Sequence, residues 1–151
     1  MDLIYRSLKF IVVILTCALV IIVGAGAFFR YILHQSLHWA TEAPNFLFMW
    51  MVFLGAAIAY RDRKHIAFSV FIEKLPAKIR STIQMTSILI LTAFFGFILI
   101  TGTKVVLINM ESETEALKIP YGIVYASVPI ASFLMLLDSL GQIWIKVRGW
   151  K

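Results

Sequence analysis

The sequence predicts an all-α integral membrane protein with four transmembrane helices, an amphipathic interfacial helix between helices 2 and 3, and both termini in the cytoplasm. Hydrophobic residues make up 61% of the chain and charged residues 15%, whereas soluble domains are nearer 45–50% apolar and about 25% charged. The mean hydropathy is +0.90. A soluble surface cannot be built from so few charges, and the charges lie between four long apolar runs. We therefore interpret residues 1–151 as a single four-helix membrane domain.

The four apolar runs define the predicted spans, at residues 10–29, 44–60, 81–103 and 119–137. The first run has 20 residues without a charge, which cover about 30 Å at 1.5 Å per residue, the thickness of a bilayer's hydrocarbon core. A signal peptide is the alternative for this run, because Arg6 and Lys9 precede it. A signal peptide's apolar region is only about 7–15 residues long, so we predict a retained span.

Proline and small residues refine two of these spans. Pro44 is expected in the first turn of the second helix, where its missing N–H costs no hydrogen bond. Pro129 lies inside the fourth span and is expected to kink that helix near Tyr125. Gly122 and Ala126 are four residues apart, so another helix can approach closely there.

The basic residues predict the orientation. Of the 14 Lys and Arg residues, two precede the first span, six lie between the second and third, and three follow the fourth, which places eleven on one side. The positive-inside rule makes that side the cytoplasm, so both termini are predicted to be cytoplasmic. A net charge of +6 can indicate nucleic-acid binding in a soluble chain. Here the charges flank apolar spans, so we predict lipid contacts and no nucleic acid.

The segment between the second and third spans has its own apolar pattern. Over residues 64–80 the apolar side chains recur at three- and four-residue spacing, at Phe68, Phe71, Ile72, Leu75 and Ile79. This pattern predicts an amphipathic helix in the cytoplasmic interface. A cytoplasmic extension of the second span, packed on a partner, is the alternative. The residues predicted to anchor the chain at lipid headgroups are Arg61, Arg63, Lys64, Lys78, Trp39 and Trp144.

Groups for catalysis or proton transport are sparse. No run has an ionisable residue in its middle, and Lys104 and Asp138 lie at the ends of spans, where both can extend to the interface. The lone Cys17 excludes an internal disulfide or a thiol relay. The sequence thus predicts neither an enzyme nor a proton-coupled exporter.

A metal site has one weak candidate. His34 and His38 are four residues apart, and Glu42 follows four residues later. Two histidines and one carboxylate without a cysteine are a poor match to zinc sites. We predict no cofactor and no metal in this chain.

The second span carries small residues on its surface. Gly55, Ala56, Ala57 and Ala59 lie close together and allow close approach of a helix. That helix can belong to this chain or to a partner. The residues alone therefore indicate a four-span scaffold without a visible reaction centre.

Two blocks of sequence resemble a known family. The segment 42–80 has an acidic residue eight positions before Trp50, then FLGAA at 53–57, a basic turn leading to His65-Ile66, and Leu75-Pro76. The second block is ALKIP at 116–120, followed by Tyr125 and by VPI at 128–130. Together they resemble the small membrane subunit, DctQ-like, of tripartite ATP-independent periplasmic (TRAP) transporters.

The resemblance implies a division of labour in a bacterial inner membrane. A large permease subunit of about a dozen spans binds sodium and substrate, and a periplasmic substrate-binding protein delivers an organic anion such as a C4-dicarboxylate or a sialic acid. The small subunit is a non-catalytic scaffold, or stator, for the large one. The residues expected to pack on the large subunit are Glu42, Trp50, Gly55, Ala56 and Ala59. The alternative is a self-sufficient homo-oligomeric small channel or exporter, which predicts flux through the chain alone.

Overall fold

The computed structural model of the chain describes residues 2–34, 38–62 and 77–148. Five helices account for the regular structure in these ranges: α1 (Asp2–Tyr31), α2 (Trp39–Arg61), α4 (Ala77–Ile108), α5 (Tyr121–Tyr125) and α6 (Ser127–Arg148). Four units are long and apolar enough to cross a membrane, because α5 and α6 together form the fourth. The prediction of an all-helical chain with four such helices is confirmed.

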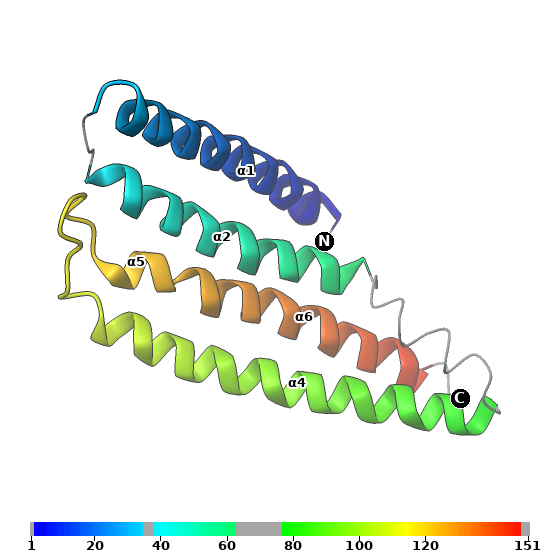
Figure 1. Cartoon of the computed structure of the whole chain (residues 1–151). Coiled ribbons are helices and arrows are strands. Elements are labelled where there is room, and N and C mark those ends of the chain that lie inside the picture. The colour runs from blue at the N-terminus through cyan, green and yellow to red at the C-terminus, as the bar shows by residue number, and fades with distance from the viewer. Residues whose placement is uncertain (1, 35–37, 63–76, 149–151) are drawn as a thin grey trace.

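The helices lie side by side in an open layer (Figure 1). Within the described residues α1 packs on α2, α2 on α6, and α6 on α4, which gives the spatial order α1, α2, α6, α4. We call the end with both chain termini the terminal end, and the end with the turns after α1 and α4 the turn end (Figure 1). Because the layer is open, many large apolar side chains of the helices are exposed. In the most apolar stretch of α1 no residue is buried, whereas 33% of the residues in the corresponding stretch of α5–α6 are buried.

The helices extend beyond the predicted apolar runs. α1 includes Arg6 and Lys9, and α6 continues past residue 137 to Arg148. The backbone hydrogen bonds of a helix do not end where its side chains become polar, so the apolar runs underestimated the helix lengths. Residues 77–80 of the predicted interfacial helix form the start of α4. The rest of that prediction, residues 64–76, lies outside the described residues.

Both proline predictions can be compared with the helices. α2 begins at Trp39, so Pro44 lies in its second turn and not in its first. The predicted position was wrong by about one turn, since residues 39–43 extend the helix towards the turn end. Near the kink predicted from Pro129, the structure has a break between two helices. The helix is interrupted at Ala126, between α5 and α6, where Pro129 has no N–H for the Tyr125 carbonyl.

Small side chains on α6 allow its neighbours to approach. Ser127, Ala131 and Ser139 are fully buried, and the two serine hydroxyls donate to the Val124 and Leu136 carbonyls of their own helix. The layer also has one aromatic contact between the helices that flank α6. The rings of Tyr60 on α2 and Phe95 on α4 meet edge to face, with centroids 5.0 Å apart, and both side chains are buried.

Gly122 of α5 is the tightest glycine position in the layer. A Cβ atom there would lie 2.8 Å from the Val106 carbonyl oxygen of α4. Because the obstacle is backbone, it cannot rotate away. The sequence predicted that a helix approaches closely at Gly122, and in the structure that helix is α4 of this chain.

We expect Gly122→Ala to lower the stability of the folded chain by about 1–3 kcal/mol, the usual cost of overpacking. The midpoint of thermal unfolding in detergent measures the effect. Gly24→Ala is the matched control, since a Cβ atom at Gly24 has no atom within 4 Å. Equal midpoints for the two variants would contradict the close contact between α5 and α4.

Candidate functional site: the exposed face of α2 and its two ends

The three small residues among the predicted packing residues of α2 lie on an open face. Ala56 and Ala59 are exposed, and a Cβ atom at Gly55 would have no atom within 4 Å. Ala57, between them in the sequence, is fully buried. Among the small residues, Ala57 is therefore used for packing within this chain, Ala56 and Ala59 are exposed, and the half-buried Gly55 has open space beside it. Trp50 is half-buried in the middle of the same helix.

The face continues towards the turn end with larger side chains. Val52 and Phe48 are exposed on α2 by 43% and 53%. Together with Ala56 and Ala59 they are spaced three or four residues apart, so they lie on one side of the helix. We call these residues and Gly55 the α2 face. A partner helix can approach the α2 face most closely in the half near the terminal end, where the side chains are small.

At the turn end, Glu42 binds backbone of this chain. Its Oε1 accepts a hydrogen bond from the Ala116 N–H and its Oε2 accepts one from the Leu117 N–H, both at 3.0 Å. The Thr114 hydroxyl and the Glu115 N–H also face this carboxylate. Glu42 lies in the first turn of α2, while its partners lie in the turn between α4 and α5. The two sequence blocks of the family resemblance therefore meet here.

The turn that Glu42 binds has internal order. The Thr114 N–H donates to the Ile119 carbonyl at 3.0 Å, and the Ile119 N–H donates to the Thr114 hydroxyl at 3.2 Å. Thr114 is 1% exposed. Lys118, between these residues, has a φ of 54°, which is uncommon for a residue with a side chain. We call residues 109–120 the outer turn.

At the terminal end, Arg61 of α2 joins a polar cluster from three helices. Its Nη1 lies 3.2 Å from Oδ1 of Asp138 on α6, and its guanidinium carbon lies 4.1 Å from the ring centroid of Tyr5 on α1. The Tyr5 hydroxyl donates to the other oxygen of Asp138. Tyr5 and Asp138 are 5% and 9% exposed. We call these three residues the polar cluster.

The polar cluster corrects one expectation. Asp138 was expected at the end of the fourth span, reaching the interface, but it lies well inside α6 and is buried. Burial of a carboxylate is tolerated when a cation and a hydrogen-bond donor accompany it. Arg61 was predicted as a headgroup anchor, and in the structure its guanidinium contacts this chain. A second ion pair, between Lys9 Nζ and Asp62 Oδ2 at 2.8 Å, lies nearby and is more exposed.

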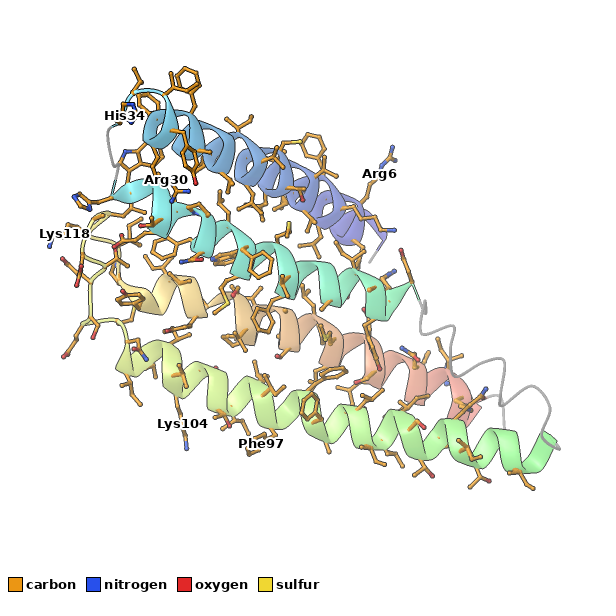
Figure 2. All side chains as sticks on the ribbon, viewed as in Figure 1. Arg6, Arg30, His34, Phe97, Lys104 and Lys118 are labelled. Carbon is orange, nitrogen blue, oxygen red and sulfur yellow. The ribbon has the colours of Figure 1, made fainter. Side chains whose placement is uncertain are left out.

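The other predicted anchors lie near the ends of helices. Trp39 starts α2 at the turn end and is 39% exposed, and Trp144 of α6 is 58% exposed near the terminal end. The Arg148 guanidinium stacks on the Trp144 ring, with its central carbon 3.8 Å from the ring centroid. Lys78 belongs to the first turn of α4, but its side chain is outside the described part, as are residues 63 and 64. Figure 2 shows Lys104 pointing away from the other helices at α4.

The weak metal candidate gains no support. In residues 2–34, 38–62 and 77–148, no group of three His, Cys, Asp or Glu side chains is placed to hold a metal ion. His34 has a φ of 50° and is exposed, and Glu42 binds the outer turn instead.

Sequence reasoning missed both polar sites at the ends of α2. Tyr5 precedes the first apolar run, and nothing in its neighbourhood indicates a partner more than 130 residues away. For Asp138, a signal did exist: the apolar pattern of α6 continues beyond it, through residues 140–145. Extending the predicted helix over these residues would have placed the carboxylate inside the span, where an ionisable residue demands a partner.

Comparison with known proteins decides the family. The sequence matches the family described as "Tripartite ATP-independent periplasmic transporters, DctQ component" over residues 19–149. The chain belongs to the DctQ family. It is a small permease subunit of a TRAP transporter and a multi-pass protein of the bacterial inner membrane. This family transports and is not a family of enzymes, which confirms the predicted absence of enzymatic activity.

Relatives within the family differ in the substrate that their names give. The chain is 27% identical over 115 residues to the sialic acid TRAP transporter small permease protein SiaQ of Vibrio cholerae, covering 76% of this chain and 66% of SiaQ. It is 28% identical over 92 residues to the C4-dicarboxylate TRAP transporter small permease protein DctQ of the same organism, covering 61% of this chain and 40% of that protein.

A third relative is much longer than this chain. The isethionate TRAP transporter permease protein DctMQ of Oleidesulfovibrio alaskensis is 28% identical over 144 residues. The match covers 85% of this chain and 22% of that protein. The DctQ part is thus joined to a large further part in that relative.

We expect the polar cluster to hold α1 against α2 and α6. Asp138→Asn leaves the Arg61 guanidinium without its carboxylate, and Tyr5→Phe removes the hydroxyl donor. Each should lower the free energy of unfolding by about 1–3 kcal/mol. The double variant should be less destabilised than the sum, by about 0.5–3 kcal/mol, because the two residues contact each other. Thermal or chemical unfolding in detergent measures these values.

The matched control for the polar cluster is Asp62→Asn. It breaks the exposed ion pair with Lys9, so its cost should be within about 1 kcal/mol. Strict additivity of Tyr5→Phe and Asp138→Asn would show that these residues do not interact.

Proposed function

We propose that this DctQ subunit is a non-catalytic scaffold, or stator, for a large permease subunit in a sodium-coupled, binding-protein-dependent transporter. The observation that carries the proposal is the open layer. Its helices leave large apolar surface uncovered, and the only buried carboxylate that the described residues show inside a helix, Asp138, is engaged by Tyr5 and Arg61. A mobile transport element needs an ion or substrate site, whereas a stator needs contact surface.

The α2 face is the proposed contact with the large subunit. Small exposed side chains let a partner helix approach the backbone of α2, and such close packing drives helix association in lipid. Glu42 and Trp50 are also proposed to contact the large subunit, although the helical spacing places Trp50 on the same side of α2 as the buried Leu54 and Ala57. The longer DctMQ relative supports the association, because a DctQ part within one larger permease protein stays beside the remainder.

The substrate is proposed to be an organic anion. The names of the relatives give C4-dicarboxylate, sialic acid and isethionate, which share a carboxylate or sulfonate group. The choice among them, and the sodium ions, are proposed to belong to the large subunit and to a periplasmic binding protein.

The orientation and the lipid contacts complete the proposal. The terminal end is proposed to face the cytoplasm, since eleven of the 14 Lys and Arg residues precede the first span, lie between the second and third in the sequence, or follow the fourth. Residues 64–80 are proposed to lie in the cytoplasmic interface, with Arg63, Lys64 and Lys78 at headgroups. Trp144 and Trp39 are proposed to anchor the two ends of the layer.

The double variant Gly55→Leu/Ala59→Leu tests the α2 face. Tagged chain is purified from its native membrane in mild detergent, and the proteins that accompany it are identified by mass spectrometry. The wild-type chain should recover a large permease one to one. The double variant should recover at least about tenfold less, because two overpacked positions cost about 1–3 kcal/mol each.

The matched control is Gly24→Leu/Ala93→Leu, which likewise replaces one Gly with open space at its Cβ position and one exposed Ala, on α1 and α4. It should leave recovery of the permease unchanged. An intact complex with the Gly55/Ala59 variant, or equal loss in the control, would refute the α2 face as the contact. Recovery of the chain only with itself would favour the homo-oligomeric channel.

Reconstitution distinguishes the stator from a self-sufficient channel. Liposomes that contain this chain alone should show no uptake of labelled organic anion above empty liposomes. Uptake should require the large permease, the binding protein and an inward sodium gradient. Flux through the chain alone would overturn the proposal.

A further inference from the structure

The outer turn is closed at its base by its own backbone. The Tyr121 N–H donates to the Ser112 carbonyl at 2.9 Å, and the Gly122 N–H donates to the Asn109 carbonyl at 3.0 Å. Beyond this base, Thr114 and Ile119 pair once more. These bonds fix the neck of the turn but involve none of the residues at its tip, 115–118.

The tip is bound from a different helix. The N–H groups of Ala116 and Leu117 both donate to the Glu42 carboxylate, one to each oxygen. A carboxylate that accepts two backbone N–H groups forms charge-assisted bonds, which are shorter and about twice as strong as neutral ones. Glu42 is itself held at the start of α2, a helix that packs on both α1 and α6.

We propose that Glu42 is a positioning residue that latches the outer turn to α2. In this view the tip takes its conformation from the Glu42 carboxylate, so the turn is formed before any partner binds and moves with α2. The left-handed backbone of Lys118, at a φ of 54°, agrees with this, because such a conformation persists in a residue with a side chain only where the surroundings fix it.

The latch adds a side-chain-to-backbone contact between parts that already meet, since α2 packs on α5 and its Tyr60 ring contacts the Phe95 ring of α4. α2 and α4 are separated in the layer by α6, and the outer turn follows α4. Through Glu42, the end of α4 and the start of α5 are tied to α2 at the turn end. The inference does not depend on the proposed function, since it concerns this chain alone.

Hydrogen exchange of the full-length chain in detergent tests the latch, read at single amides by mass spectrometry with electron-transfer fragmentation. In the wild-type chain the amides of Ala116 and Leu117 should exchange slowly. Glu42→Gln retains the shape but replaces one acceptor oxygen by a donor and removes the charge. Exchange at both amides should accelerate at least about tenfold, while amides in the middle of α2 and α6 keep their rates.

The matched control is Glu111→Gln, which removes the same charge from an exposed side chain of the same turn. It should leave the rates of both amides unchanged. Wild-type rates in folded Glu42→Gln protein would overturn the latch. Equal acceleration in Glu111→Gln would also overturn it, because the effect would then be one of net charge.

A conservative variant keeps the proposal testable if Glu42→Gln does not fold. Glu42→Asp retains the charge but withdraws the carboxylate by one methylene group. It should give exchange rates between those of the wild-type chain and an unlatched turn, at these two amides alone. Unchanged rates in Glu42→Asp, together with unchanged rates in Glu42→Ala, would show that the turn is ordered without Glu42.

Discussion

The structure depends on α2 being held at both ends by side chains that bind outside their own helix. Helices in hydrocarbon gain little from covering apolar surface against one another, because lipid tails are equally apolar. Close backbone approach and polar contacts therefore decide the arrangement. Glu42 supplies the contact at the turn end, and Arg61 supplies it at the terminal end through Asp138 and Tyr5. Between these ends, the fully buried Ala57 contributes close packing.

An open layer has a consequence for function. A closed bundle would bury its small residues inside, whereas here Ala56 and Ala59 remain exposed beside a buried Ala57. The four long helices therefore form a broad apolar layer that is stabilised by contacts within the chain. Such a layer suits the proposed role as a fixed partner of a large permease, because a fixed partner has to resist deformation while the transport part moves against it.

Much of the fold could be predicted from the sequence, for a simple physical reason. Uncharged runs of bilayer length identify spans, and Pro129 identifies the helix interruption at Ala126. The order of the helices in the layer could not be predicted, because apolar faces that meet lipid and apolar faces that meet protein have the same composition. The pairings of Glu42 with residues 116–117 and of Tyr5 with Asp138 join distant parts of the chain, and no local pattern encodes them.

The central claim is that the α2 face contacts a large permease and keeps that contact throughout transport. It is tested most directly by a photo-crosslinking amino acid at position 59, in the transporter assembled in its native membrane. Crosslinks are mapped by mass spectrometry with and without sodium and organic anion. The account predicts crosslinks to one set of residues of the large permease in every condition. The claim would be contradicted by crosslinks to lipid or to a second copy of this chain. It would also be contradicted if the crosslinked residues of the large permease changed when substrate was added.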